Sequence, residues 1–287
     1  MTDNVPMLDW TFRAMDADWR IHHGGGVSGE DAQTIAEAVN RDELLWSRFL
    51  PQSDVTRITR GAGHPVRVDP ATLDLVVAAI DWSERTEGRF QPLVGGALRA
   101  WGYQESVGNA APNSAPASDA IGGAIVVDPE LSTVTIPVDT QLDLGGIGKS
   151  WAAVRAGAVL ANLVLDQRLI IDAGGDLTMV RGDHRIETAA GAVLAVEGTG
   201  VATSSSERRQ WKLADGSVSH HLIDPSTGAP SARGTAIVAG IDPVAADVLA
   251  SCVVLDPAYL DLVDAPAARI SVADAVTTNA RWETIRA

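Results

Sequence analysis

The chain has 287 residues, of which 46% are hydrophobic and 21% are charged, as expected for an ordinary globular protein. This composition excludes a collagen, a coiled coil and a wholly disordered chain. Lys and Arg number 22 against 37 Asp and Glu, so the formal net charge is −15, and such a field repels phosphate backbones and anionic lipid surfaces. We therefore expect no nucleic-acid partner, and an anionic substrate would need local cations.

Cysteine content and the N-terminal segment bear on the compartment. Cys252 is the only cysteine, so no intramolecular disulfide can form. Residues 1–6 are polar and acidic and lack the basic segment and apolar run of a secretory signal. The longest apolar stretches, such as 245–255, are far shorter than the roughly 20 residues of a membrane-spanning helix. We expect a cytoplasmic protein without membrane insertion.

Two amphipathic helices are predicted in the first third of the chain. One begins after the capping residue Ser28, has acidic residues in its first turn, and is closed by Pro51. The second follows Asp69-Pro70 and ends near Gly88. Its apolar stripe is Leu73, Val76, Val77 and Ile80. We interpret both helices as scaffold.

Residues 104–123 are rich in Ala, Ser, Pro and Gly, which predicts an exposed loop or linker. We expect it to separate two lobes of a single domain spanning 1–287. Short strands are predicted at 124–128 and 133–137. A Gly pair at 145–146 then opens into a long Ala, Val and Leu pattern, which indicates a turn followed by a buried helix.

The last third alternates between strand and helix patterns. A helix is predicted at 245–255, and strands are predicted at 169–172, 192–196, 235–240, 270–273 and 282–285. This order favours an α+β protein with mixed sheets and helices in two halves, and with the site in the cleft between the halves.

The sequence Gly-Lys-Ser at 148–150 resembles the end of a phosphate-binding P-loop. The full motif requires Gly at position 143, where this chain has Asp143, so a nucleotide triphosphatase is disfavoured. A glycine-rich turn at a helix start still presents free amides to an anion, and Lys149 adds a cation. The alternative is that the glycines only permit a tight turn and that Lys149 points into water.

Three further segments carry polar groups at turns or strand ends. Residues 173–176, Ala-Gly-Gly-Asp, allow close approach of a ligand or form only a turn. The hydroxyl groups at 203–206 would donate to phosphate or cap a helix. At 219–228 two histidines precede an Asp-Pro-Ser-Thr-Gly turn. A histidine there either exchanges protons near neutral pH or lies in a surface loop.

Asp247 and Ser251 are four residues apart in an apolar helix, which places a carboxylate and a hydroxyl on one face. Oxygen ligands at this spacing suit Mg²⁺, which takes its other ligands from waters and substrate phosphates. The alternative is that Asp247 complements the helix dipole while Ser251 bonds back to a carbonyl.

The order of these motifs resembles that of the FAD:protein FMN transferase family, also called ApbE-like flavin transferases. The matching segments are 143–149, 173–176, 202–204, 221–228 and 246–251, with upstream matches at Met15, 46–53, 88–95 and 101–102. The resemblance covers nearly the whole chain. It implies a fold related to the T-fold, with FAD bound in a cleft.

The resemblance also implies an activity. Such an enzyme cleaves FAD with Mg²⁺, transfers FMN through a phosphoester bond to a Thr or Ser of an acceptor flavoprotein, and releases AMP. The alternatives are an FAD pyrophosphatase that forms FMN and AMP, and a non-catalytic FAD-binding relative.

The same resemblance assigns roles to particular residues. It places the metal on the Gly146 carbonyl, Asp247 and Ser251, and makes His221, with Asp247, the catalytic group beside the reacting phosphate. The implied FAD contacts are Met15, Phe49, Phe90, Gln91, Pro92, Asp143, Lys149, Thr203 and Ser204. Trp101 and Trp151 are candidates for stacking on the flavin, with core packing as the alternative.

Several positions depart from the pattern of the family. Ser251 stands where Thr is usual, which keeps the ligating oxygen and loses a methyl group. Asp16-Ala17 replaces Gly-Thr and adds a carboxylate near the ligand. Gln91 stands where Asp is common.

Overall fold

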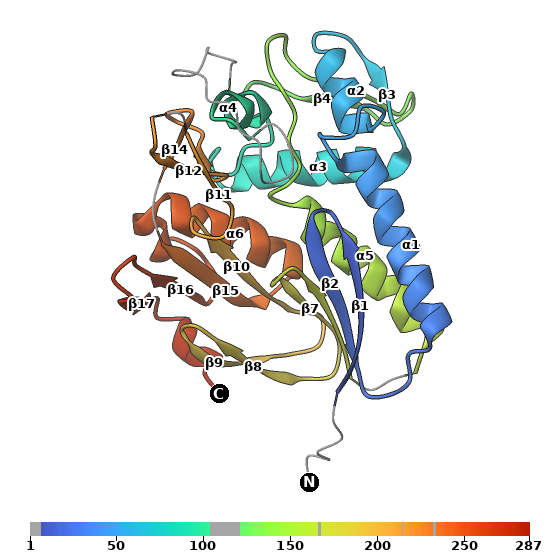
Figure 1. Ribbon diagram of the computed structural model, residues 1–287, viewed down its shortest axis with the longest axis vertical. Helices are drawn as coiled ribbons and strands as arrows, with labels where there is room; N and C mark the ends of the chain where they lie inside the picture. The colour runs from blue at the N-terminus through green and yellow to red at the C-terminus, as the bar shows by residue number, and fades with distance from the viewer. Residues whose placement is uncertain (1–6, 104–120, 166–167, 214, 232–233) are drawn as a thin grey trace.

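The computed structural model describes residues 7–103, 121–165, 168–213, 215–231 and 234–287. Its largest element is an eight-stranded sheet in which all neighbouring strands are antiparallel (Figure 1). In spatial order the strands are β1 (Leu8–Ala14), β2 (Ala17–His23), β6 (Leu169–Ala173), β7 (Leu177–Arg181), β10 (Gly200–Ser205), β15 (Thr235–Ile241), β16 (Ala267–Ile270) and β17 (Val276–Thr278). An α+β fold with several sheets is therefore confirmed.

Helices cover one face of this sheet (Figure 1). The helices are α1 (Gly29–Trp46), α2 (Asp54–Arg60), α3 (Pro70–Arg85), α4 (Gly95–Ala100), α5 (Gly148–Leu163) and α6 (Pro243–Leu255). α5 packs on β6 and β7, α6 packs on β10 and β15, and α1 packs on α5 and β1. The main core lies in this layer, where fully buried Trp19 and Ile21 of β2 belong to one cluster with Ala152 and Ala156 of α5. Small residues on α5 let the helix approach the sheet closely.

A hairpin covers the opposite face of the sheet. It consists of β8 (His184–Thr188) and β9 (Gly191–Ala195), and the short 3₁₀ helix η2 (Trp282–Thr284) packs beside it. Trp282 is almost fully buried in this second cluster, with Met179 and Ile237 of the sheet. Because both faces of the central strands are covered, β15 is buried at consecutive positions and does not alternate.

The four predicted helices are confirmed, although α1 ends at Trp46, before the predicted stop at Pro51, and α6 begins at Pro243, before the predicted 245. Ser28 and Asp31 form a capping box at α1, and the Asp69 side chain caps α3. The helix predicted after 145–146 is α5, and the one predicted at 245–255 is α6. One detail of the α3 stripe was wrong: Val77 is 48% exposed, whereas Leu75 is fully buried.

Two C-terminal strand predictions are wrong. The strand ends at Ile270 and the chain then turns, so 270–273 is not a strand. Residues 282–285 form a 3₁₀ turn, because the Ile285 N–H donates to the Trp282 carbonyl in place of a neighbouring strand. Of the predicted linker 104–123, residues 104–120 lie outside the described residues.

The remaining predicted strands are present, in smaller sheets where they do not join the large one. β5 (Thr133–Thr135) is the central strand of a small sheet and pairs with β4 (Val126–Asp128) on one side and β3 (Val66–Arg67) on the other. Two separate ribbons follow β10: β11 (Gln210–Lys212) with β12 (Val218–His220), and β13 (Ile223–Asp224) with β14 (Ala229–Pro230). In the part of the chain that the structure describes, no helix has the length and apolarity to cross a bilayer.

Candidate active site

Several turns and strand ends meet at one end of the large sheet. The β1–β2 pairing closes at Ala14 and Ala17, and the end of β6 lies beside the start of β2. β10 pairs with the start of β7 and then runs past it, so Thr203 lies beside the β6–β7 turn. There the Thr203 N–H donates to Asp176 Oδ1 at 3.0 Å. This end of the sheet forms one wall of a cavity.

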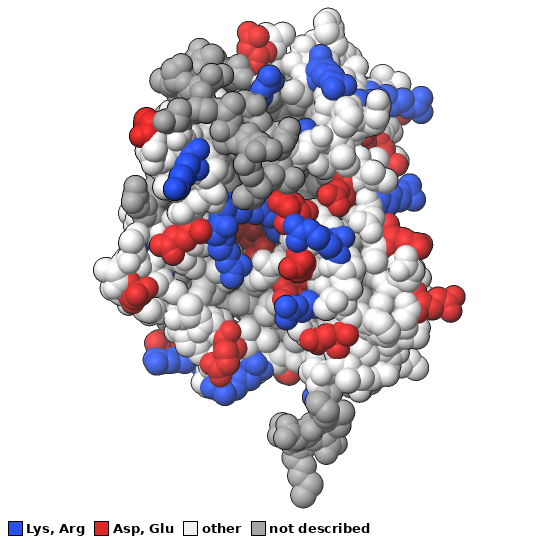
Figure 2. Space-filling model, in the orientation of Figure 1, with Lys and Arg blue, Asp and Glu red and all other residues white. Residues whose placement is uncertain are grey.

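The cavity has a volume of about 540 Å³, and we call it the cleft. The sheet end, the start of α5, one face of α6, the segment after α1 and the ribbons after β10 all contribute to it. On the face drawn in Figure 2, a hollow has both basic and acidic side chains around its mouth. The volume is sufficient for a cofactor-sized ligand.

The cleft brings together almost all of the residues implied by the resemblance. Its lining includes Met15, Phe49, Phe90, Gln91, Asp143, Gly146, Lys149, Thr203, Ser204, His221, Asp247 and Ser251. Pro92 is not part of the lining, and its carbonyl accepts the Asp143 N–H at 2.8 Å. Trp101 and Trp151 also lie outside the lining. Trp101 donates to the Gly228 carbonyl at 2.9 Å, while Trp151 packs against the main core, in agreement with the packing alternative.

Oxygen atoms suitable for a hard cation gather on one side of the cleft. Asp247 is buried, and its Oδ2 has no hydrogen-bond partner among the described residues. Ser251 lies one turn further along α6 and hydrogen-bonds Ser204 through the hydroxyls at 2.9 Å. The Gly146 backbone lines the same cavity. A buried carboxylate oxygen without a partner is costly unless a cation or proton satisfies it, so this donor set fits Mg²⁺.

No group of three or more His, Cys, Asp and Glu side chains that could hold a metal occurs among the described residues. This finding argues against a zinc-type site built from several such side chains. It does not bear on the set above, which uses one carboxylate, a hydroxyl and a main-chain carbonyl.

Asp176 and Asp247 are two buried carboxyl groups whose charges interact. Burial, followed by the charge of Asp247, raises the pKa of Asp176 to about 7, and Lys149 acts in the opposite direction. Burial also raises the pKa of Asp247, again opposed by Lys149. Ionising both carboxyls in this apolar setting is unfavourable until a cation compensates them. The cleft therefore favours a bound cation at this position.

His221 is a half-buried residue that also lines the cleft. Burial, followed by the positive charges of Arg209 and Lys149, lowers the pKa of His221 to about 3. The ring is therefore neutral at physiological pH and able to accept a proton. Its Nδ1 is buried and has no hydrogen-bond partner within the described residues.

The balance of charge in the cleft differs from that of the whole chain. Among the described residues of the lining, six are basic and five are acidic, in a chain of net charge −15. Arg13 pairs with Asp16 at 3.0 Å, so the extra carboxylate of this chain is compensated beside the cleft. Lys149, Arg208 and Arg209 add further positive charge. Such a cavity can accept an anion that the rest of the surface would repel.

Motif reasoning gave no role to several cleft residues. Asp176 was part of a recognised motif, and the Arg208-Arg209 pair followed another, but neither was assigned a contact. Arg48 lies in the matching segment 46–53 but has no implied contact, and Tyr103 lies outside the matching segments, because their contacts join segments far apart in the sequence. Glu43 of α1 also lines the cleft and accepts the Met15 N–H at 2.8 Å. The end of α1 is therefore part of the site as well as scaffold.

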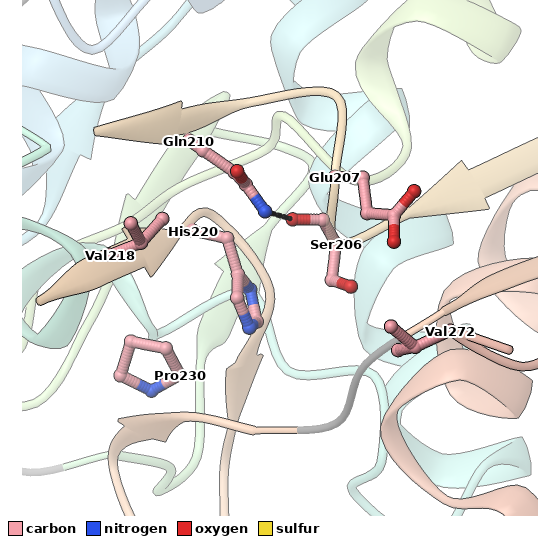
Figure 3. A pocket seen from close by; sticks show the side chains of 7 residues that line it. All are labelled: Ser206, Glu207, Gln210, Val218, His220, Pro230 and Val272. Carbon is pink, nitrogen blue, oxygen red and sulfur yellow. Dashed lines mark hydrogen bonds between the residues drawn. The ribbon is translucent and has the colours of Figure 1, made fainter. Parts of the chain in front are cut away.

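A second cavity of about 420 Å³ lies on the other side of the same backbone segments (Figure 3). Ser205 lines the cleft and Ser206 the second cavity, and the same alternation holds for His221 and His220. In Figure 3 the Gln210 side chain reaches back to the Ser206 carbonyl, an interaction of 2.9 Å. The ribbons after β10 thus form a thin partition between two cavities.

The fold is shared with solved flavin transferases. The ApbE protein from Thermotoga maritima MSB8 matches with a TM-score of 0.84, covering 98% of this chain and 99% of that one at 24% identity. The flavinyl transferase ApbE of Pseudomonas stutzeri in its apo form matches with a TM-score of 0.80 at 18% identity, covering 97% and 96%. These two structural matches show that the chain has the fold of the solved ApbE proteins.

The ApbE family model matches residues 15–270, and the chain belongs to this family. A curated FAD:protein FMN transferase of Salmonella typhimurium is 26% identical over 266 residues, which cover 81% of this chain and 73% of the relative. Another, from Rhodobacter capsulatus, is 30% identical over 207 residues, covering 64% of this chain. The match spans only 38% of the length of that second relative.

Proposed function

We propose that the protein is a Mg²⁺-dependent FAD:protein FMN transferase. It would cleave the pyrophosphate of FAD, attach FMN to a Thr or Ser hydroxyl of an acceptor flavoprotein, and release AMP. The observation that supports this most directly is that one cleft is lined both by the neutral His221 and by Asp247, whose buried Oδ2 has no hydrogen-bond partner among the described residues. The names of the curated relatives support the same reaction.

Asp247, Ser251 and the Gly146 carbonyl would hold the metal. When bound, Mg²⁺ supplies Lewis-acid polarisation of the pyrophosphate and neutralises its charge. Lys149 is the second residue of α5, a helix start without a side-chain cap, so its cationic side chain and the helix N-terminus both favour a bound anion. Lys149, with Arg208 and Arg209, would hold the diphosphate in a chain whose overall charge opposes it.

His221 would accept the proton of the attacking hydroxyl. The new bond joins the acceptor oxygen to the phosphorus of the FMN half, and the bond from that phosphorus to the oxygen of AMP breaks. The imidazole must be neutral before this step, and its lowered pKa keeps it neutral. Because phosphoryl transfer needs mainly positioning and charge stabilisation, these groups account for most of the chemistry.

The experiment incubates the protein with FAD, MgCl₂ and an acceptor protein that a curated relative modifies. Flavin fluorescence that stays on the denatured acceptor, together with AMP, supports the transferase. AMP without labelling supports an FAD pyrophosphatase with water as the nucleophile, and bound flavin with neither product supports a binding protein.

Two variants make the test specific to the site. Asp247→Ala should abolish Mg²⁺-dependent AMP release, because it removes the one carboxylate in the metal set. Asp74→Ala is the matched control, since Asp74 lies exposed on α3 and does not line the cleft. Full activity of Asp247→Ala would refute the proposed metal site.

A further inference from the structure

Arg48 occupies an unusual position for a charged residue. It lies in the segment between α1 and α2, and only 14% of its side chain is exposed. Its Nε lies 2.8 Å from Asp143 Oδ2, and its Nη2 donates to the Tyr103 carbonyl at 2.5 Å. Three segments far apart in the sequence therefore meet at one guanidinium group.

Aromatic rings pack against the guanidinium group. Its central carbon lies 4.3 Å from the centroid of the Phe49 ring and 4.7 Å from that of Tyr103. Tyr103 in turn stacks on Trp211 at 5.1 Å with an interplanar angle of 7°. Lysine could not make these contacts together, because only guanidinium combines a planar face with several donors in a fixed fork.

Asp143 is correspondingly restrained. Its Oδ1 accepts the Gly145 N–H at 2.8 Å, and its Oδ2 forms an ion pair with Arg48 Nε, an atom that makes no hydrogen bond among the described residues. Attraction between the opposite charges therefore restrains the second oxygen while the residue lines the cleft. Asp143 belongs to no helix or strand, but its N–H donates to the Pro92 carbonyl and its neighbours Leu142 and Leu144 are buried, so the backbone is anchored and the side chain is oriented by its own contacts. A carboxylate on such a segment binds a ligand well only when its orientation is fixed in advance.

We propose that Arg48 is a positioning residue of the cleft, which acts on flavin dinucleotide affinity by fixing the Asp143 carboxylate toward the ligand. The inference rests on the proposed function, because it takes FAD as the ligand of the cleft. It goes beyond that function by adding a residue that acts through Asp143 and not by direct contact.

A double-mutant cycle tests the proposal. FAD affinity is measured by fluorescence titration for the wild type, Arg48→Met, Asp143→Asn and the double variant. Each single variant should bind FAD about 10-fold more weakly, and the double variant should lose no more than about 10-fold, because both changes remove the same interaction. A double variant weakened by about 100-fold would show independent contributions and overturn the proposal, as would unchanged affinity in Arg48→Met.

Two controls separate positioning from general damage. Arg57→Met breaks a comparable pair outside the cleft, where Arg57 bonds buried Asp54 at 2.7 Å and the Arg67 carbonyl at 2.7 Å. It should lower the melting temperature and leave FAD affinity within about twofold. If Arg48→Met does not fold, Arg48→Lys replaces it in the cycle. The FAD affinities of Arg48→Lys, Asp143→Asn and their double variant are then compared in the same way, and additive losses overturn the proposal.

Failure of the proposed function gives a different result. If the wild-type protein does not bind FAD at all, the proposed function fails and the role of Arg48 in FAD binding fails with it. If the wild type binds FAD and the cycle is additive, only the positioning role is overturned.

Discussion

Replacement of Asp176 by Asn should change how stability depends on pH. Asn keeps an oxygen that can accept the Thr203 N–H, and it removes a carboxyl group that burial and Asp247 make hard to ionise. In the wild type the folded state holds this proton up to about pH 7, whereas the unfolded chain releases it near pH 3.8. The raised pKa therefore gives stability that is fully present below the unfolded value and is lost as pH rises through about 7.

The magnitude follows from the two pKa values. Each pH unit in which only the unfolded chain is ionised costs the folded state about 1.4 kcal/mol. From about pH 5.5 to about pH 8, wild-type Asp176 therefore loses about 2 kcal/mol of folding free energy that the uncharged amide of the variant does not lose. Asp176→Asn should thus gain about 2 kcal/mol relative to the wild type between the two pH values.

The assay is urea unfolding of both proteins at the two pH values, with EDTA present to remove divalent cations. Comparing the difference between the two pH values cancels any constant cost of burying the Asn amide. It also cancels the titration of groups that do not interact with Asp176, whereas the contribution of Asp247, whose charge acts on Asp176, is part of the measured difference. An equal stability difference at the two pH values would refute the reasoning, and so would a relative loss by the variant at the higher pH.

Three further variants probe other parts of the site. His221→Ala should slow AMP release by about 10²–10⁴-fold while FAD affinity is kept, and a fall in affinity with unchanged turnover would contradict a role as base. Gly175→Ala places a Cβ 2.5 Å from Arg208 Nη1, which can move aside, but the φ of +102° strains any residue other than glycine, so urea unfolding should show a loss of about 1–3 kcal/mol. Trp211→Ala should cost about 3–5 kcal/mol, because this ring is 8% exposed and stacks on Tyr103. A calorimetric change below about 1 kcal/mol would show that Trp211 packs less tightly than the structure indicates.

The parts of the fold that sequence predicted well are those with local signals. Ser28 and Asp69 are side-chain caps that act within one turn of their helices, so both helix starts could be placed from a few residues. The 282–285 segment had apolar ends that suited a strand, but Trp282 is buried from a 3₁₀ turn in a cluster built by distant strands. Whether a short apolar segment forms a strand or a 3₁₀ turn depends on tertiary packing, which cannot be seen in the local sequence pattern.

The same contrast holds for the candidate site. The residues gathered in the cleft were largely found through motif order, because each motif is a short turn or helix start. The matching segment 46–53 contains Arg48, but its contacts could not be predicted in that way: its partners Tyr103 and Asp143 lie 55 and 95 positions away, and only the folded chain brings them together. The pKa of Asp176 likewise depends on Asp247 and on burial, and neither is visible in the segment 173–176.

The ribbons after β10 are attached to the protein more weakly than the central strands, and this affects how the protein loses activity on warming. β11 to β14 do not join the large sheet, and bonds such as Trp211 Nε1 to the Trp101 carbonyl at 2.7 Å tie them to α4. Regions held in this way open at lower free energy than central strands, so their amides should exchange with deuterium before those of β6 and β15. His221 lies between the two ribbons, and warming should therefore inactivate the protein while its central scaffold is still folded.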